Sequence, residues 1–168
     1  MEYEPTLTRI QREHSVWVAE NFGEQPAWAP LLGMGEEYGE AMEHAADREE
    51  FLDAVGDFSI FFLHYLGIKR WDAALIWSLR DSVARAEGRP WPVLLGRLMH
   101  HELKTHQEIR GSAKRHTASG QILSSQLFAY LEHHCKQMGA DYLDVVERTW
   151  AKVRQRDWRA HRAGEGDL

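Results

Sequence analysis

The sequence contains a single cysteine, Cys135, so no disulfide can form within the chain. This is typical of proteins from a reducing compartment. The N-terminus, MEYEPTLTRIQREH, is charged and has no apolar stretch of the signal-peptide type. The longest apolar run, residues 58–68, falls short of the roughly 20 residues that a membrane-spanning helix needs. These absences predict a cytoplasmic protein that has no membrane partner.

The chain also lacks an excess of positive charge. It has 20 Lys and Arg against 26 Asp and Glu, and its formal net charge is −6. An acidic chain gives no electrostatic reason to expect nucleic acid as a partner. A phosphate-cradling glycine-rich loop and a G-x-S-x-G motif are both absent. Hydrophobic residues make up 43% of the 168 residues, which is enough for a core of ordinary size.

Strand-like alternation is absent as well, and the glycines and prolines concentrate between segments with helical periodicity. The sequence therefore predicts an all-α fold. The predicted helices cover residues 7–21, 30–46, 48–66, 71–87, 92–108, 118–138 and 140–157.

Two pairs of segments indicate an internal duplication. WAPLLG at 28–33 recurs as WPVLLG at 91–96, and WDAALIW at 71–77 is matched by DYLDVVERTW at 141–150. A helix order that also repeats favours duplication over chance. The prediction is a repeat at 1–90 and a second repeat at 91–168, packed as one compact domain.

Acidic residues stand out in two neighbouring predicted helices. Glu37 and Glu40 are spaced i, i+3 on the first, while Asp53 and Asp57 are spaced i, i+4 on a second helix that is apolar nearly all round. A buried, unpaired carboxylate is costly unless a cation compensates its charge. Mg²⁺ prefers oxygen ligands, so the pattern predicts a metal site between the two helices. The alternatives are a solvated acidic face and acids with a structural role.

Other metal chemistries are weaker. His100, His106, His134 and Cys135 could meet across helices as zinc ligands, but their spacings match no strong zinc template, and ordinary histidines are the favoured interpretation. A di-iron bundle needs E-x-x-H motifs, and none occurs in the first half of the chain.

The two acidic segments read EEYGE (36–40) and DAVGD (53–57). In this respect the chain resembles the all-α nucleoside triphosphate pyrophosphohydrolases of the MazG-like superfamily, whose members carry EExxE on one helix and usually ExxD on the next. The segments NFGEQPAWAPLLG and GADYLDVVERTWAKVRQRDW are similar to that family's lead-in and closing helix. One position departs from the pattern: Ala54 stands where ExxD has Glu, and the acid lies one residue earlier, at Asp53.

The resemblance implies a Mg²⁺-dependent enzyme, with Mn²⁺ as the alternative ion. It would hydrolyse a nucleoside triphosphate to the monophosphate and pyrophosphate in nucleotide-pool house-cleaning. The implied metal ligands are Glu37, Glu40, Asp53 and Asp57. Glu36 would orient or deprotonate the attacking water.

Two arginines of the segment SLRDSVARAEGR, Arg80 and Arg85, are candidates for holding the phosphate tail. A solvated surface role is the competing interpretation for both. Trp28, Trp71 and Trp77 are candidates for the base pocket, although a core role is the commoner one for tryptophan.

The second repeat lacks the acids. Met99, His100 and Leu103 occupy the positions that correspond to Glu36, Glu37 and Glu40, and Gly120-Gln121 corresponds to Gly56-Asp57. The chain is therefore predicted to be a fused pseudo-dimer with one site, since family members pair their subunits into four-helix bundles. Whether the fused chain forms a further homodimer stays open. The rival hypothesis is a catalytically decayed nucleotide-binding or regulatory protein on the same fold.

Overall fold

The computed structural model describes residues 4–82, 89–107 and 113–161, and these residues form helices and no strand. The all-α prediction is confirmed. The elements are α1 (Thr6–Phe22), α2 (Trp28–Glu43), α3 (Arg48–Ile68), α4 (Ala73–Ser78), α6 (Trp91–His106), α7 (Ala113–Gln137), α8 (Tyr142–Val153) and a 3-10 helix (Trp158–His161).

The helix boundaries agree with the predicted ones to within a few residues, with one main exception. The helix predicted over 71–87 begins at Ala73 but its regular part ends at Ser78, and residues 83–88 lie outside the described part of the chain. Side-chain caps fix several starts: Asp47, Asp72 and Asp141 each accept a hydrogen bond from a backbone N–H of the following helix. These aspartates explain why α3, α4 and α8 begin where they do.

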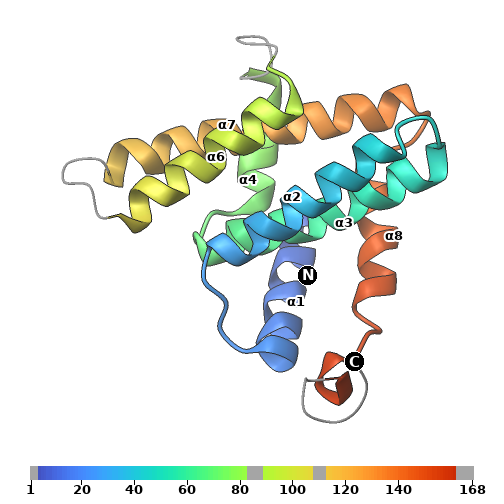
Figure 1. The fold of residues 1–168 in the computed structure, drawn as a ribbon, viewed down its shortest axis with the longest axis horizontal. Helices are drawn as coiled ribbons and strands as arrows, with labels where there is room; N and C mark the ends of the chain where they lie inside the picture. The colour runs from blue at the N-terminus through green and yellow to red at the C-terminus, as the bar shows by residue number, and fades with distance from the viewer. Residues whose placement is uncertain (1–3, 83–88, 108–112, 162–168) are drawn as a thin grey trace.

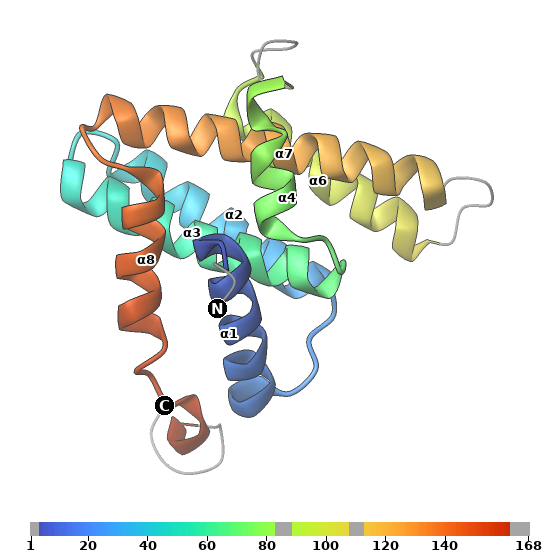
Figure 2. The ribbon, with the colours of Figure 1, turned by 180° about the vertical axis from the view of Figure 1, so that it is seen from behind.

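Two helical hairpins are stacked on each other (Figures 1 and 2). One is formed by α2 and α3, which make the most extensive helix pair of the fold, and the other by α6 and α7. Helices α1 and α8 lie together on the side of α2 and α3 that faces away from the α6–α7 hairpin (Figure 1). Helix α3 is therefore covered from several sides.

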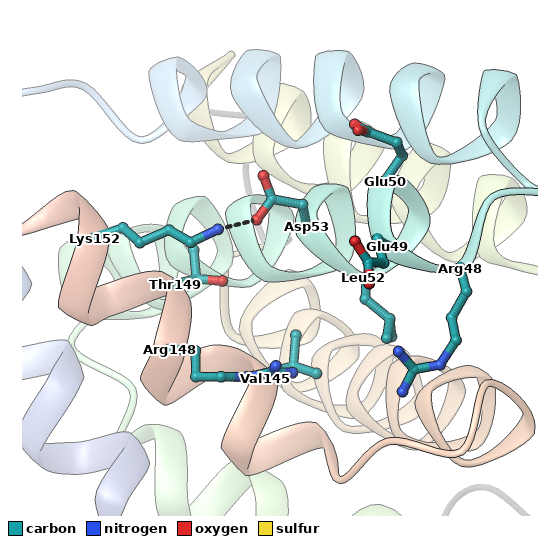
Figure 3. Close-up of a pocket in the computed structure, with 9 residues that line it drawn as sticks. All are labelled: Arg48, Glu49, Glu50, Leu52, Asp53, Val145, Arg148, Thr149 and Lys152. Atoms are coloured by element: carbon teal, nitrogen blue, oxygen red, sulfur yellow. Dashed lines mark hydrogen bonds and ion pairs between the residues drawn. The ribbon is translucent and has the colours of Figure 1, made fainter.

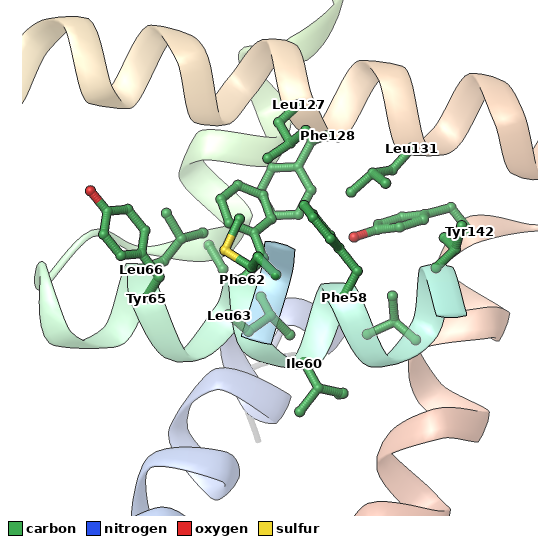
Figure 4. Close-up of a cluster of buried hydrophobic side chains, with 14 of the residues drawn as sticks. Phe58, Ile60, Phe62, Leu63, Tyr65, Leu66, Leu127, Phe128, Leu131 and Tyr142 are labelled. Carbon is green, nitrogen blue, oxygen red and sulfur yellow. The ribbon is translucent and has the colours of Figure 1, made fainter. Parts of the chain in front are cut away.

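The core is built around α3. Phe58, Phe62 and Leu66 are fully buried, and the ring of Phe62 lies 4.7 Å from that of Phe128 on α7 (Figure 4). Burying each such side chain stabilises the fold by roughly 1.5–3 kcal/mol. The one hydroxyl pair in this region is satisfied: Tyr142 donates to Ser59, which donates to the carbonyl of Val55.

Helix α3 is also long and apolar enough, by length and composition, to cross a membrane, and it is the one such helix in the described ranges. Of its most apolar window, 67% is buried inside the fold. That degree of burial is also what the central helix of a water-soluble protein shows.

The last helix of each predicted repeat packs on the opposite repeat. Helix α4 packs on α7 and, to a similar extent, on α1 and α3 of its own half, whereas α8 packs mainly on α3. Each half has a glycine at a close contact: a Cβ placed on Gly56 of α3 would lie 2.0 Å from the Thr149 hydroxyl of α8, and one on Gly120 of α7 would lie 2.6 Å from the ring of Trp71, which precedes α4. Helix α8 therefore lies on the first half of the chain, and α4 connects the two halves.

Candidate functional site

The five acids of the sequence pattern lie along the seam between α2 and α3. Glu37 and Asp57 are partly buried there, whereas Glu36, Glu40 and Asp53 are exposed. Their charges interact across the seam, because Asp57 acts on the pKa of Glu37 and Glu40 acts on the pKa of Asp57. The structure therefore brings the predicted acids of the two helices together.

Glu37 is the most strongly perturbed of these acids. Burial, followed by the neighbouring charge of Asp57, raises its pKa to about 8. Its Oε2 atom is buried and has no hydrogen-bond partner within the protein. A carboxylate oxygen of this kind is available to a cation or a proton, and few ordinary structural acids are left in that state.

Asp53 differs from the expectation that both aspartates are buried. Its side chain is 53% exposed, and its Oδ1 atom accepts a hydrogen bond of 2.7 Å from Lys152 of α8 (Figure 3). Asp57 is more enclosed. Burial and Asp53 raise its pKa, while Arg156 and Lys152 act in the opposite direction. Lys152 of α8 and Arg156, which follows that helix, thus supply cations that the sequence near Asp53 and Asp57 does not.

A pocket of about 400 Å³ opens beside this ion pair, between the start of α3 and α8 (Figure 3). Three cations line it: Arg48, Arg148 and Lys152. Asp53 lies on the same wall, together with Glu49 and Glu50. The pocket therefore places three cations beside three carboxylates, and the cations could receive phosphate oxygens.

Arg80, which was predicted to bind phosphate, does not join the acids. Its guanidinium forms an ion pair with Glu132 of α7 at 2.8 Å and lies 3.9 Å above the ring of Trp77. Its charge is therefore already used to fasten the segment after α4 onto α7. Arg85 lies outside the described residues.

A second pocket, of about 280 Å³, lies one to two helical turns along the same seam. Phe61 and His64 follow Asp57 on α3, while His14 and Trp17 come from α1. The pocket is completed by Val18, Phe22, Gln25, Ala29 and Pro30. We refer to it as the aromatic pocket. Its size and lining suit a flat ring with polar edges.

His14 is the buried polar group of the aromatic pocket. The residue is 3% exposed, its ring stacks on Trp17 at 5.6 Å, and its Nδ1 atom has no partner within the protein. Burial lowers its pKa to about 3 and that of His64 to about 4. Both rings are therefore neutral at pH 7, and His14 presents an unused hydrogen-bonding nitrogen.

The burial of these two imidazoles predicts a pH-dependent stability. A histidine with a lowered pKa stabilises the fold above the unfolded-state pKa near 6.5, and this contribution is lost as the pH falls towards 4 and 3. The two histidines should lower the midpoint of thermal unfolding between pH 7 and pH 5, against an opposite contribution from Glu37, whose raised pKa stabilises the fold as the pH falls. A His14→Gln variant should lose about 1–2 kcal/mol less stability over that interval than the wild type.

The measurement is thermal unfolding followed by circular dichroism at several pH values, with the exposed His106→Gln variant as the control. An identical pH slope in the wild type and in His14→Gln would contradict the prediction.

The side chains of the described residues do not already form a metal cage: no three His, Cys, Asp or Glu groups converge closely enough to hold an ion. This applies to the acids and equally to His100, His106, His134 and Cys135. The acids nevertheless fit Mg²⁺ in donor type, since all are oxygen ligands and Glu37 has a buried oxygen that is not otherwise bonded. Mutually repelling carboxylates can converge once an ion offsets their charge.

The sequence did not reveal the groups contributed by α1 and α8. Lys152 and Arg156 are spaced i, i+4 on the polar side of the closing segment WAKVRQRDW, and this spacing was the available signal. His14 gave no signal, because a single histidine in a helix is ordinary. None of the three tryptophan candidates lines the aromatic pocket; Trp71 is in the core, and Trp77 stacks on Tyr142.

Neither a scan against protein-family models nor searches of curated proteins and of solved structures finds a match for this chain.

Proposed function

We propose that this protein is a Mg²⁺-dependent nucleoside triphosphate pyrophosphohydrolase that releases a nucleoside monophosphate and pyrophosphate. The observation that carries the proposal is the half-buried Glu37, which has an unbonded carboxylate oxygen and raised pKa and lies beside Asp57 at the seam of α2 and α3. Such a group is a ready ligand for a divalent cation.

In this proposal Glu37, Glu40, Asp53 and Asp57 hold Mg²⁺, with Mn²⁺ as the alternative. When bound, the ion would neutralise phosphate charge and lower the pKa of the attacking water. Glu36 is exposed at the same seam, and its proposed role is to orient or deprotonate that water.

Other residues along the seam suit the phosphate tail and the nucleobase of the substrate. Lys152 and Arg156 are the proposed phosphate contacts, since both already act on Asp57, and Lys152 would exchange its bond to Asp53 for a phosphate oxygen. The aromatic pocket is the proposed position of the nucleobase, in which His14 would contact a polar edge of the ring. Acids, cations and aromatic groups thus follow one another along a single seam.

The packing of α4 on α7 and of α8 on α3 supports a fused pseudo-dimer of the MazG-like type. The glycines at the two close contacts, Gly56 and Gly120, are also the residues that the repeat aligns with each other. Helix contacts between the halves, together with a close contact at each of two aligned glycines, are what a duplication would leave.

The direct test is an assay of the purified protein with Mg²⁺ and each common ribo- and deoxyribonucleoside triphosphate. Pyrophosphate and the monophosphate should appear in equal amounts, and EDTA should stop their release. Release of inorganic phosphate and a diphosphate would contradict the proposed bond cleavage. Saturable nucleotide binding without any product would instead favour the decayed nucleotide-binding protein.

A Lys152→Ala variant separates the phosphate role from a structural one. We expect KM for the nucleotide to rise about tenfold or more, since a charge-assisted contact contributes about 1.5–3 kcal/mol. The unfolding temperature should change little, because the ion pair with Asp53 is largely exposed.

Arg12→Ala is the matched control for Lys152→Ala, because Arg12 is similarly exposed and pairs with Glu4 at 3.0 Å away from the seam. An unchanged KM in Lys152→Ala, or an equal rise in both variants, would remove Lys152 from the site.

A further inference from the structure

The second half of the chain carries two adjoining cavities on the α6–α7 hairpin, away from the acids. The larger measures about 550 Å³ and the smaller about 150 Å³, and both are lined by Arg89 and Gln126. Residues of α7 at helical spacing, from Ser119 through Gln126 to His133, form one continuous wall. We refer to the two cavities together as the α6–α7 groove.

Gln126 is the unusual residue of this groove. It is 8% exposed, lies where the two cavities meet, and its Oε1 atom has no hydrogen-bond partner within the protein. A buried acceptor without a partner is costly, because it has lost its hydrogen bonds to water. The hydroxyls of Ser124 and Ser125 and the indole N–H of Trp91 are also buried without a partner in this hairpin, but none of them lines the groove, whereas Gln126 lines both of its cavities. The unused oxygen of Gln126 indicates a donor that comes from outside the chain.

The charges around the groove are unevenly distributed. Among the described residues that line the smaller cavity, Arg89, Arg97 and His101 are basic and none is acidic. The larger cavity has apolar walls from Leu94 and Ala129 beside the ring of Tyr130. Its charged lining is mixed, with acidic Asp81 and Glu132 and basic Arg89 and Lys136, and Glu132 is paired with Arg80 and Lys136. An anionic group therefore fits the smaller cavity, and a less polar ring fits the larger one.

We propose that the α6–α7 groove is a second binding site that takes a nucleoside monophosphate. The phosphate would lie in the smaller cavity at Arg97, a ribose hydroxyl or base N–H would donate to Gln126 Oε1, and the base would lie against Tyr130. The cavity volumes suit a ligand of this size. The choice of a nucleoside monophosphate rests on the proposed function, whose product it is; the groove itself does not. In this proposal the second half, which lacks the metal-binding acids of the first, senses the product.

The test is isothermal titration calorimetry in EDTA, with the intact chain and a panel of nucleoside monophosphates, ribose 5-phosphate and inorganic phosphate. We expect saturable binding of a monophosphate that becomes at least tenfold weaker in Arg97→Glu and in Gln126→Leu. Arg12→Glu reverses an equally exposed charge on α1 and should bind as the wild type does. Because Arg97 is exposed, its substitution leaves the core intact.

Several results would overturn the proposal. They are no saturable binding, binding that Arg97→Glu leaves unchanged but Lys152→Ala removes, and binding of inorganic phosphate as tight as that of the nucleotide. The last result would leave an anion site only. Pyrophosphate release without monophosphate binding at the groove would contradict this inference and leave the proposed function standing. Binding at the groove without any triphosphate hydrolysis would contradict the proposed function and leave the groove as a binding site.

Discussion

A Glu37→Gln variant should lose pyrophosphate release by about 100-fold or more and, in the absence of metal, should unfold at a higher temperature than the wild type. The loss follows from removing a charged ligand of the proposed ion, since about 3 kcal/mol of transition-state stabilisation corresponds to a factor of about 100. The gain in stability follows from removing a carboxylate that the fold does not otherwise satisfy.

The direction of the stability change comes from the pKa of Glu37. Because burial raises that pKa from about 4.5 to about 8, the folded state holds the proton more tightly than the unfolded state does. The corresponding stabilisation is complete below pH 4.5 and is lost as the pH rises towards 8. At pH 8 the Gln variant avoids this loss, and we expect a gain of about 1–2 kcal/mol after allowance for solvent screening.

Metal should reverse the order of the two unfolding temperatures. Saturating Mg²⁺ stabilises the folded wild type by mass action, and the Gln variant should gain much less. The measurement is thermal unfolding at pH 8 in EDTA and in Mg²⁺, beside the pyrophosphate assay. The exposed Glu43→Gln variant is the control. Full activity in Glu37→Gln, or an unfolding temperature below that of the wild type in EDTA, would contradict the account.

Sequence periodicity was sufficient to predict the helices and the pairing of the two acidic segments. When an i, i+3 pair and an i, i+4 pair lie on the facing sides of consecutive antiparallel helices, packing of the helices brings the two pairs close together. The burial of Asp53 was predicted wrongly because its neighbours in the sequence are apolar. Its exposed fraction depends instead on where α8 lies, and Lys152 is 99 residues away along the chain.

Contacts between residues this far apart in the sequence are determined by helix packing, and sequence periodicity gives no information about that packing. Arg80 illustrates the same limit. In the sequence it was one of few cations at a suitable distance from the acids, but its partner, Glu132, belongs to α7. The repeat contained a usable clue, because a helix of one half that packs on the other places the cations of the second half beside the acids of the first. The sequence predicted a duplication but gave no sign of where α8 packs.

The packing of α8 depends on how closely it can approach α3, and this distance is controlled by Gly56. A Cβ there would lie 2.0 Å from the Thr149 hydroxyl oxygen and 3.0 Å from the Thr149 Cβ. Both residues are buried, so the added methyl cannot be accommodated by a surface movement. Helix α8 must shift, and with it the position of Lys152 relative to Asp53.

A Gly56→Ala variant should therefore be destabilised by about 1–3 kcal/mol, although alanine is the better helix former. For a chain of this length each kcal/mol lowers the unfolding temperature by about 2–4 °C. Gly96→Ala on α6 is the matched control: a Cβ there meets nothing within 4 Å, so that variant should be as stable as the wild type or more stable. Removing the obstructing hydroxyl in a Gly56→Ala/Thr149→Ala double variant should restore part of the loss, because the two side chains occupy the same space. A Gly56→Ala variant as stable as Gly96→Ala would show that α8 does not rest on α3 at this glycine.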